Sequence, residues 1–206
     1  YLISVIVQCF LFSCFGVSWN ILGGYGGQIS WCHAAFASIG AYTSLILYSM
    51  FGVTPLLTVF VGIALAVVFA TIIGRVTFRY RGPFFAITTI AFGEILRVLL
   101  LNMDSLTGGS AGMYIPYNGP QPWCLVFQND RPFYYIALAL LLLALLYTKW
   151  MERSKMGYYL RAIKGDEDAA QSLGMDTSKV KVRAFQISAA IMAIAGMVYG
   201  FYMGYV

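Results

Sequence analysis

Charged side chains are scarce in this sequence. Asp, Glu, Lys and Arg make up 10% of its 206 residues, whereas they make up about a quarter of an average soluble domain. Hydrophobic residues make up 60%, and the mean hydropathy is +0.77. This composition excludes an ordinary soluble domain and is typical of an integral membrane protein.

Residues suited to catalysis or metal binding are equally sparse. The sequence has one histidine, His33, and four cysteines without metal-ligand spacing, although a zinc site needs several such ligands together. Residues 107–112 resemble a phosphate loop but lack its Gly-Lys-Ser/Thr ending. No nucleophile–base pair and no clustered set of His, Asp or Glu is present. We therefore predict a protein that is not an enzyme, with no metal, no cofactor and no structural disulfide.

Long apolar runs, by contrast, are abundant. A membrane-spanning helix needs about 20 predominantly apolar residues. Six windows approach this length: residues 2–22, 34–51, 55–74, 84–101, 133–150 and 184–206. We predict an all-α integral membrane protein, a polytopic helix bundle with about six spans, in one transmembrane domain over residues 1–206. Because residue 1 is Tyr and the outer windows touch both ends, we expect a fragment of a longer protein.

The basic residues predict the topology. Three arginines lie within residues 75–81, and eight Lys or Arg residues lie within residues 149–183. These two loops are an even number of spans apart, so they share one side, which the positive-inside rule makes cytoplasmic. Residues 102–132 contain one basic residue, Arg131, and are predicted to form an external loop. The net charge of +5 follows from this topology, so no nucleic-acid partner is needed to explain it.

Residues 149–183 form a charged loop that holds 13 of the 21 charged residues. Ser154 can cap a first short helix that runs to Lys164. A second helix would run from Asp166 to Leu173. A glycine follows each of these helices and would end it.

One side of the two loop helices is expected to be an apolar stripe. The stripe consists of Tyr159, Ile163, Ala170 and Leu173. The loop could rest on the lipid surface or dock in a groove of a protein partner. The acidic run 166–168 favours the partner, because an anionic leaflet would repel it. Thr177 or Ser178 is predicted to cap the last span.

The first span ends in Asn20 and a glycine-rich run at residues 23–27, followed by Gln28. Glycine costs about 1 kcal/mol relative to alanine inside a helix, so we expect the helix to break here. Two interpretations stay open: a broken element packed against the protein interior, or a tight cytoplasmic turn.

The fourth span carries Glu94 and Arg97, one helical turn apart on one face. Charged groups inside a membrane normally face protein or water. The pair could orient the helix as a structural ion pair, or it could line a translocation route or gate. The candidate path or gate residues are Asn20, Gln28, His33, Glu94 and Arg97.

Small residues recur at helical spacing in two spans, which is typical of close helix packing in membranes. In the second span they are Ala34, Ala37, Ser38, Ala41 and Ser44, with Gly40 beside them. In the sixth span they are Gly196, Gly200 and Gly204. Their partner could lie within the chain or in a second subunit.

Three segments resemble one known family. They are GGYGGQISWCHAAFASIGAY (23–42), RGPFFAITTIAFGEILRVLLLNMDSLTGGSAGM (81–113) and GYYLRAIKGDEDAAQSLGM (157–175). All three look like permease subunits of branched-chain amino acid ABC importers, and of the two permease types they are more similar to the LivM type. The resemblance covers nearly the whole chain.

The resemblance implies that residues 157–174 form a coupling element seated in a cleft of a cytoplasmic ATPase. Its implied residues are Gly157, Leu160, Arg161, Ala162, Ile163, Asp166, Glu167, Ala169, Ala170, Leu173 and Gly174. The implied assembly has two ABC ATPases, a second homologous permease and an external solute-binding protein that docks on the face of residues 102–132. The implied substrate is a branched-chain amino acid, and the implied location is a bacterial cell membrane. Importers of urea or amides, and more distantly a secondary transporter or channel, are the alternatives.

Overall fold

The computed structural model describes residues 1–80, 82–115, 123, 125–127 and 129–206. Within them, six helices are long and apolar enough to cross a membrane, which confirms the predicted all-α fold with six spans. They are α1 (Leu2–Asn20), α2 (His33–Phe51), α3 (Pro55–Thr77), α4 (Pro83–Asn102), α6 (Arg131–Arg153) and α9 (Thr177–Met203). The short elements are the π turn η1 (Ile21–Tyr25), α5 (Asp104–Thr107), the 3-10 turn η2 (Gly109–Ala111), α7 (Lys155–Gly165) and α8 (Glu167–Ser172).

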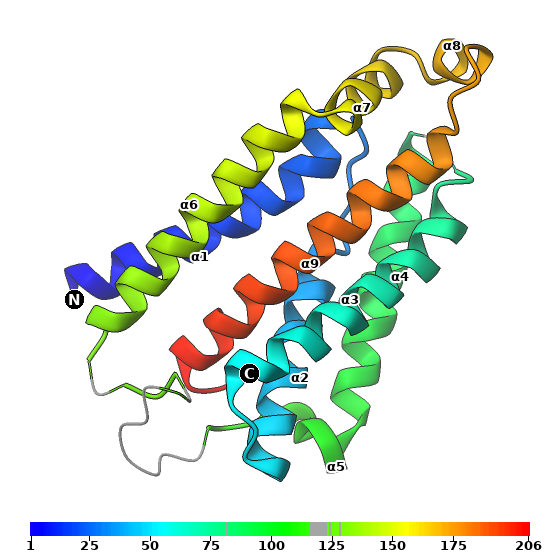
Figure 1. The fold of residues 1–206 in the computed structure, drawn as a ribbon. Helices are drawn as coiled ribbons and strands as arrows, with labels where there is room; N and C mark the ends of the chain where they lie inside the picture. The colour runs from blue at the N-terminus through cyan, green and yellow to red at the C-terminus, as the bar shows by residue number, and fades with distance from the viewer. Residues whose placement is uncertain (81, 116–122, 124, 128) are drawn as a thin grey trace.

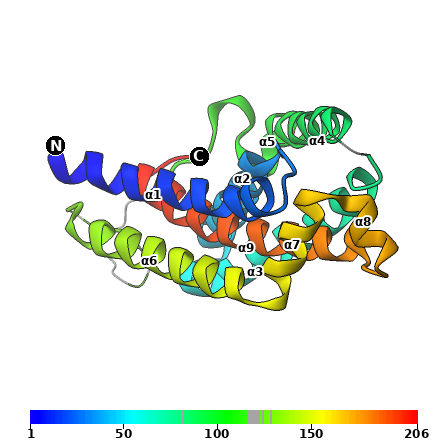
Figure 2. The same ribbon diagram turned by 90° about the horizontal axis from the view of Figure 1, so that it is seen from above.

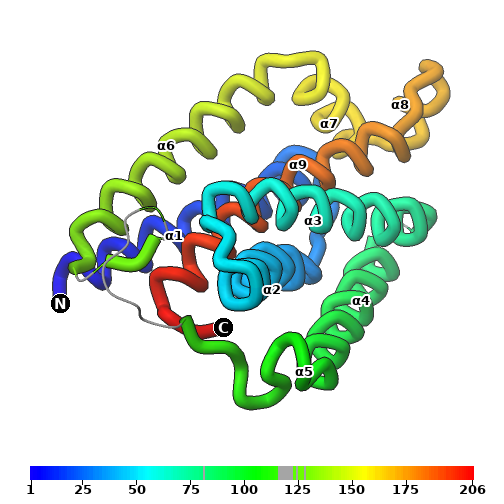
Figure 3. The backbone as a smooth tube through the Cα atoms, turned by 60° about the horizontal axis from the view of Figure 1, so that its bottom comes forward, coloured from blue at the N-terminus to red at the C-terminus, as the bar shows by residue number. Residues whose placement is uncertain are grey.

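The helix α9 lies at the centre of the bundle. It contacts α1, α2, α3 and α6, and 67% of its most apolar window is buried, against 11% for α4. The pair α1 and α6 forms one side of the molecule and α4 the other, with α2, α3 and α9 between them (Figures 1 and 3). Seen from above, α7 and α8 extend from one end of this bundle (Figure 2).

The crossing of α2 and α9 depends on small residues. A Cβ added at Gly196 would lie 2.2 Å from the Ala37 carbonyl oxygen, and one added at Gly40 would lie 2.1 Å from the Ala193 carbonyl oxygen. Gly200 likewise faces Ala41. The small-residue faces of the second and sixth spans therefore pack against each other within the chain.

The glycine Gly204 does not belong to this contact. It follows α9 in the left-handed conformation, with φ 76°, and has no atom within 4 Å of its would-be Cβ. A glycine in this position can adopt the left-handed conformation that ends a helix without steric cost. Within the chain, Gly196 and Gly200 thus lie on the contact with α2, and Gly204 does not.

The glycine-rich run does not break the first helix where we expected. The chain continues from α1 through η1, so Gly23 and Gly24 are helical, and the helical path ends at Gly26. A Cβ at Gly23 would lie 2.7 Å from the Trp19 ring, so this glycine permits a close approach. The Trp19 Nε1–H donates to the Ser30 carbonyl at 2.8 Å. The run is a packed, irregular element rather than an exposed tight turn.

The segment after α4 folds back onto the end of the chain. Met113 and Val206 exchange backbone hydrogen bonds of 2.8 and 3.0 Å, and Tyr114 and Tyr205 form an isolated antiparallel bridge. Within the predicted external loop, residues 113–115 therefore pair with residues 204–206. Pro116, Tyr117, Pro120, Pro122 and Cys124 lie outside the described residues, while Tyr114 and Trp123 are exposed.

The two predicted loop helices are present, but the caps differ from the prediction. Ser154 takes the cap position of α7, yet its hydroxyl donates to the Met151 carbonyl at 2.6 Å instead of accepting from α7. Asp166 caps α8 by accepting from the backbone N–H groups of Asp168 and Ala169.

The last span is capped by Asp176, which accepts from the Lys179 N–H at 3.0 Å. The prediction of Thr177 or Ser178 was wrong because Asp176 is already at the cap position, and because the Thr177 hydroxyl is used elsewhere. Hydrogen bonds from Lys179 lower the pKa of Asp176 below its usual value. The cap is thus formed by a carboxylate, which the N-terminal end of a helix dipole favours.

Candidate functional site

The helix α7 packs onto the irregular end of the first span. Leu160 is fully buried, and its Cδ2 lies 3.4 Å from the position that a Cβ on Gly26 would take. A Cβ on Gly157 would lie 2.5 Å from the Glu152 carbonyl oxygen, so this glycine allows the sharp turn between α6 and α7. The apolar contact and the turn together fix where α7 lies on the bundle.

Polar contacts hold α7 in the same place. The Lys164 ammonium donates to the Gly24 carbonyl at 2.8 Å, and the Arg161 guanidinium donates to the Glu152 carbonyl at 2.7 Å. The Tyr25 hydroxyl donates to the Glu152 carboxylate at 3.4 Å. The Lys164 hydrogen bond joins α7 directly to the end of the first span, and Glu152 of α6 contacts both.

The expected apolar stripe does not exist as one surface. Ile163 and Ala170 are each 4% exposed, whereas Tyr159 is 43% and Leu173 is 88% exposed. The prediction assumed a continuous helix pair, but Asp166 has an extended backbone that turns α8 away from α7. The loop therefore has inner residues, which face the bundle, and outer residues, which face away from it.

The predicted coupling residues divide between these two sets. Gly157, Leu160, Ile163 and Ala170 are buried, and Glu167 is partly buried. Arg161, Ala162, Asp166, Ala169, Leu173 and Gly174 are exposed.

A buried ion pair joins α8 to α9. The Lys181 ammonium lies 2.5 Å from Glu167 Oε1, and the two side chains are 1% and 15% exposed. Thr177 donates to the same Glu167 oxygen at 3.1 Å. Removing one partner of a buried pair typically costs about 3–5 kcal/mol, because the other charge is left uncompensated. The sequence interpretation missed Lys181, since nothing in its spacing from Glu167 relates the two residues.

Aromatic contacts continue from this ion pair into the bundle. The Lys181 ammonium lies 5.9 Å from the centre of the Phe78 ring, which stacks on Phe85 and meets Phe185 edge-on. His33 contacts Phe185 and lies 2.8 Å, Nε2 to Oγ, from Ser188. The loop is thus linked to the centre of the bundle through side-chain contacts.

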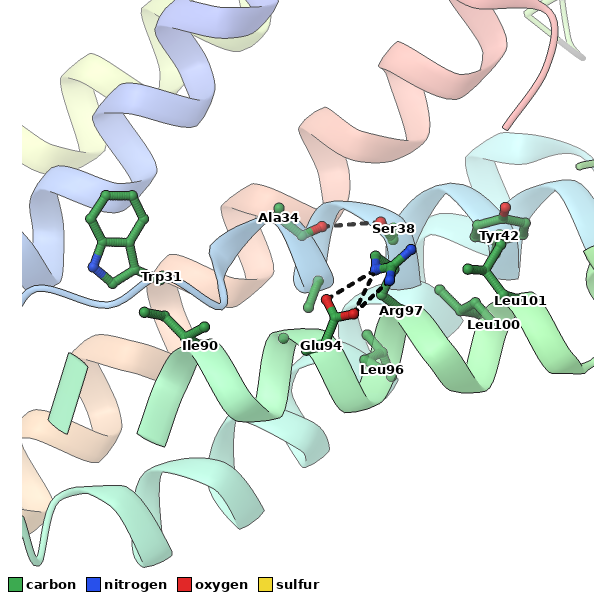
Figure 4. A pocket seen from close by; sticks show the side chains of 12 residues that line it. Trp31, Ala34, Ser38, Tyr42, Ile90, Glu94, Leu96, Arg97, Leu100 and Leu101 are labelled. Carbon is green, nitrogen blue, oxygen red and sulfur yellow. Dashed lines mark hydrogen bonds and ion pairs between the residues drawn. The ribbon is translucent and has the colours of Figure 1, made fainter. Parts of the chain in front are cut away.

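A cleft of about 570 Å³ lies between α2 and α4 (Figure 4). Glu94 and Arg97 line it from α4, with side chains that are 55% and 62% exposed. The Arg97 Nε–H donates to both carboxylate oxygens of Glu94, at 3.1 and 2.9 Å, and Nη2–H donates to Oε1 at 2.5 Å. The other lining residues are Trp31, Ala34, Ala35, Ser38, Tyr42, Ile90, Gly93, Leu96, Leu100 and Leu101.

The structure does not bring the five candidate path residues together. Only Glu94 and Arg97 line the cleft. His33 is buried in the core, Asn20 lies over Gly24, and Gln28 is half-buried beyond the π turn. In the described part of the chain, no group of three or more His, Cys, Asp or Glu residues could hold a metal ion.

Comparison with known proteins identifies a family and several relatives of this chain. The model of the family described as branched-chain amino acid transport system / permease component matches residues 1–206. No solved structure matches the chain.

Two curated relatives carry the name high-affinity branched-chain amino acid transport system permease protein LivM. The one from Escherichia coli (strain K12) is 31% identical over 93% of this chain and 50% of its own length. The one from Salmonella typhimurium is 28% identical over 99% of this chain and 53% of its own length.

The LivH permease protein of Escherichia coli (strain K12) is 28% identical over 91% of this chain and 66% of its own length. The chain thus spans about half the length of the two LivM relatives. Since the family model matches the whole chain, the chain belongs to the permease family of branched-chain amino acid transport systems.

Proposed function

We propose that this chain is a permease subunit of an ATP-driven importer that moves branched-chain amino acids across a bacterial cell membrane by alternating access. The observation that carries the proposal is the loop of α7 and α8. Its inner side is fastened to two spans, and its outer side presents exposed residues away from the bundle. An importer with separate ATPase subunits needs such an element, because the force of ATP binding has to reach the membrane helices.

The proposed coupling element is residues 157–174. Its outer residues, which include Arg161 and Leu173, would sit in a cleft of the ATPase, as an amphipathic helix sits in a groove of a partner. Its inner residues, Leu160 and Glu167, would pass the movement to the first span and to α9. The protein partners in this proposal are two ATPases, a second permease and an external solute-binding protein.

The positions of the loops support the proposed sidedness. The contact between Lys181 and Phe78 brings residues 75–80 and the charged loop to the same end of the bundle. Both segments are rich in basic residues, so the positive-inside rule makes this end cytoplasmic. The segment around residues 104–115 lies at the other end (Figure 1), where a solute-binding protein would dock.

The outer surface of the loop can be tested with Leu173→Glu. Leu173 is 88% exposed, so we expect unchanged thermal stability of the isolated permease. Burial of one leucine in a partner contributes about 1.5–3 kcal/mol, so binding of the ATPase should weaken about tenfold or more. The measurement is titration of the purified ATPase onto the permease in nanodiscs.

The matched control for Leu173→Glu is Ser178→Glu, which adds the same charge at an exposed position outside residues 157–174. This control should bind the ATPase as tightly as the unchanged chain. Equal binding by Leu173→Glu and the unchanged chain would contradict the proposed docking surface.

A further inference from the structure

We propose that the cleft between α2 and α4 binds a zwitterionic amino acid, with Arg97 pairing with the ligand's carboxylate and Glu94 with its ammonium group. This inference rests on the proposed function and adds the residues that recognise the substrate during its passage.

The position of the pair argues against contact with lipid. Glu94 is 11 residues after Pro83, and Arg97 is five residues before Asn102. At 1.5 Å per residue, Glu94 lies roughly 16 Å from the start of α4, near the middle of the span, and Arg97 lies roughly 8 Å from its end. A charged residue at the centre of a membrane costs about 2.5–3.5 kcal/mol even on the lowest scales. Such groups therefore face water, protein or a polar ligand, and here they face the cleft.

The hydrogen bonds also argue against the idea that Glu94 and Arg97 connect α4 to another helix. Among the described residues, the side-chain hydrogen bonds of Glu94 and Arg97 join these two residues only to each other, within α4. The only buried residues of α4 are Phe85 and Thr89. The ion pair thus does not hold α4 against its neighbours.

The pair still has hydrogen-bonding capacity for a ligand. A guanidinium has five N–H donors, and the bonds to Glu94 come from Nε and Nη2 of Arg97, which leaves both N–H groups of Nη1 and one of Nη2. An ionised carboxylate has about four lone-pair sites, of which three are used. A ligand with both charges can therefore pair with both residues without separating them, whereas an ion of one sign would be attracted by one residue and repelled by the other.

The rest of the cleft suits an aliphatic side chain. Ile90, Leu96, Leu100 and Leu101 line it beside the ion pair, and Trp31 and Tyr42 mark its two ends (Figure 4). Its volume of about 570 Å³ lies within the range of small-molecule sites, about 300–1,000 Å³. An ion pair in the middle of the cleft and apolar side chains around it are suited to bind a hydrophobic amino acid.

The test measures equilibrium binding of three ligands to the whole permease–ATPase complex in nanodiscs without the solute-binding protein. Leucine has both charges, leucinamide lacks the carboxylate, and 4-methylpentanoate lacks the ammonium group. We expect leucine to bind about 10- to 100-fold more tightly than either analogue, since each loses a charge-assisted hydrogen bond.

Two substitutions should give a crossed pattern. Arg97→Gln should weaken leucine about tenfold or more and leave leucinamide unchanged. Glu94→Gln should weaken leucine similarly and leave 4-methylpentanoate unchanged. Arg97→Lys should restore part of the leucine affinity, and Arg131→Gln, which removes an arginine far from the cleft, should not alter it.

Several results would overturn the inference. Equal binding of the three ligands by the unchanged complex would do so, and this result does not depend on any variant folding. Equal weakening of all ligands by both substitutions would indicate a structural pair. Absence of leucine binding in a complex that still imports leucine would place recognition elsewhere. Absence of ATP-driven leucine import by the unchanged complex would instead contradict the proposed function itself.

Discussion

Replacing Lys181 with alanine is expected to release α8 from α9 and to lower leucine-stimulated ATP hydrolysis of the assembled importer at least tenfold. The substitution leaves the Glu167 carboxylate, only 15% exposed, without its ammonium partner, which should cost about 3–5 kcal/mol. The release is measured as faster hydrogen exchange of the α8 amides, because exchange reports the free energy of local opening.

The matched control for this substitution is Lys179→Ala. Lys179 lies two residues away on the same helix and pairs with Asp176 at 2.8 Å, but its side chain is 78% exposed. An exposed ion pair contributes about 0–1 kcal/mol, so the exchange of α8 and the ATPase activity should stay close to normal. Identical behaviour of the two variants would show that the buried pair has no special role.

Swapping the charges of Glu167 and Lys181 is a second test of the same ion pair. Glu167→Lys and Lys181→Glu should each lower coupling, and the double substitution should recover part of it, because the opposite charges again face each other. A double variant as inactive as the single ones would mean that other contacts of Glu167 or Lys181 matter more than their attraction. This double-mutant cycle separates the energy of the interaction between the two residues from the effects of each single substitution.

Replacing Leu160 with alanine should destabilise the docked position of α7 by about 2–5 kcal/mol, the usual cost of such a truncation in a packed core. Leu160 is fully buried and lies beside Gly26 of the glycine-rich run. We expect a lower apparent melting temperature in detergent and substrate-independent ATP hydrolysis in the assembled complex, because the loop would move without moving the spans.

The natural comparison for Leu160→Ala is Leu173→Ala, the same change at a leucine of the same loop that is 88% exposed. It should leave the melting temperature within about 1 °C of the unchanged chain, since surface substitutions usually change stability by under 0.5 kcal/mol. A similar loss of stability in both variants would contradict the division of the loop into an inner and an outer side.

The sequence predicts this fold well where the determinants are local. Six apolar windows predicted six spans because the length of a membrane-spanning helix is set by the bilayer. The glycines at 165 and 174 predicted two loop helices because helix ends depend on a few neighbouring residues. The resemblance to permeases of branched-chain amino acid importers was likewise carried by contiguous motifs, and the family match confirms it.

Contacts between distant residues were not predictable in this way. Lys181 was interpreted as a topological charge, and only its position in space shows that it meets Glu167. Ile163 and Leu173 looked equivalent by periodicity, yet one is buried on the bundle and the other is exposed. Glu94 and Arg97 could be paired from their spacing, but the cleft that they line is formed with α2, more than 50 residues away in the chain.

Leucine uptake by proteoliposomes tests the central claim most directly. The vesicles would contain the full-length permease with its second permease and two ATPases, ATP inside and the solute-binding protein outside. We expect leucine to accumulate against its gradient with ATP, and not with a non-hydrolysable analogue or with Lys181→Ala. Uptake that is driven by an ion gradient without ATP, or ATP-driven uptake that is unaffected by Lys181→Ala, would contradict an importer coupled through α7 and α8.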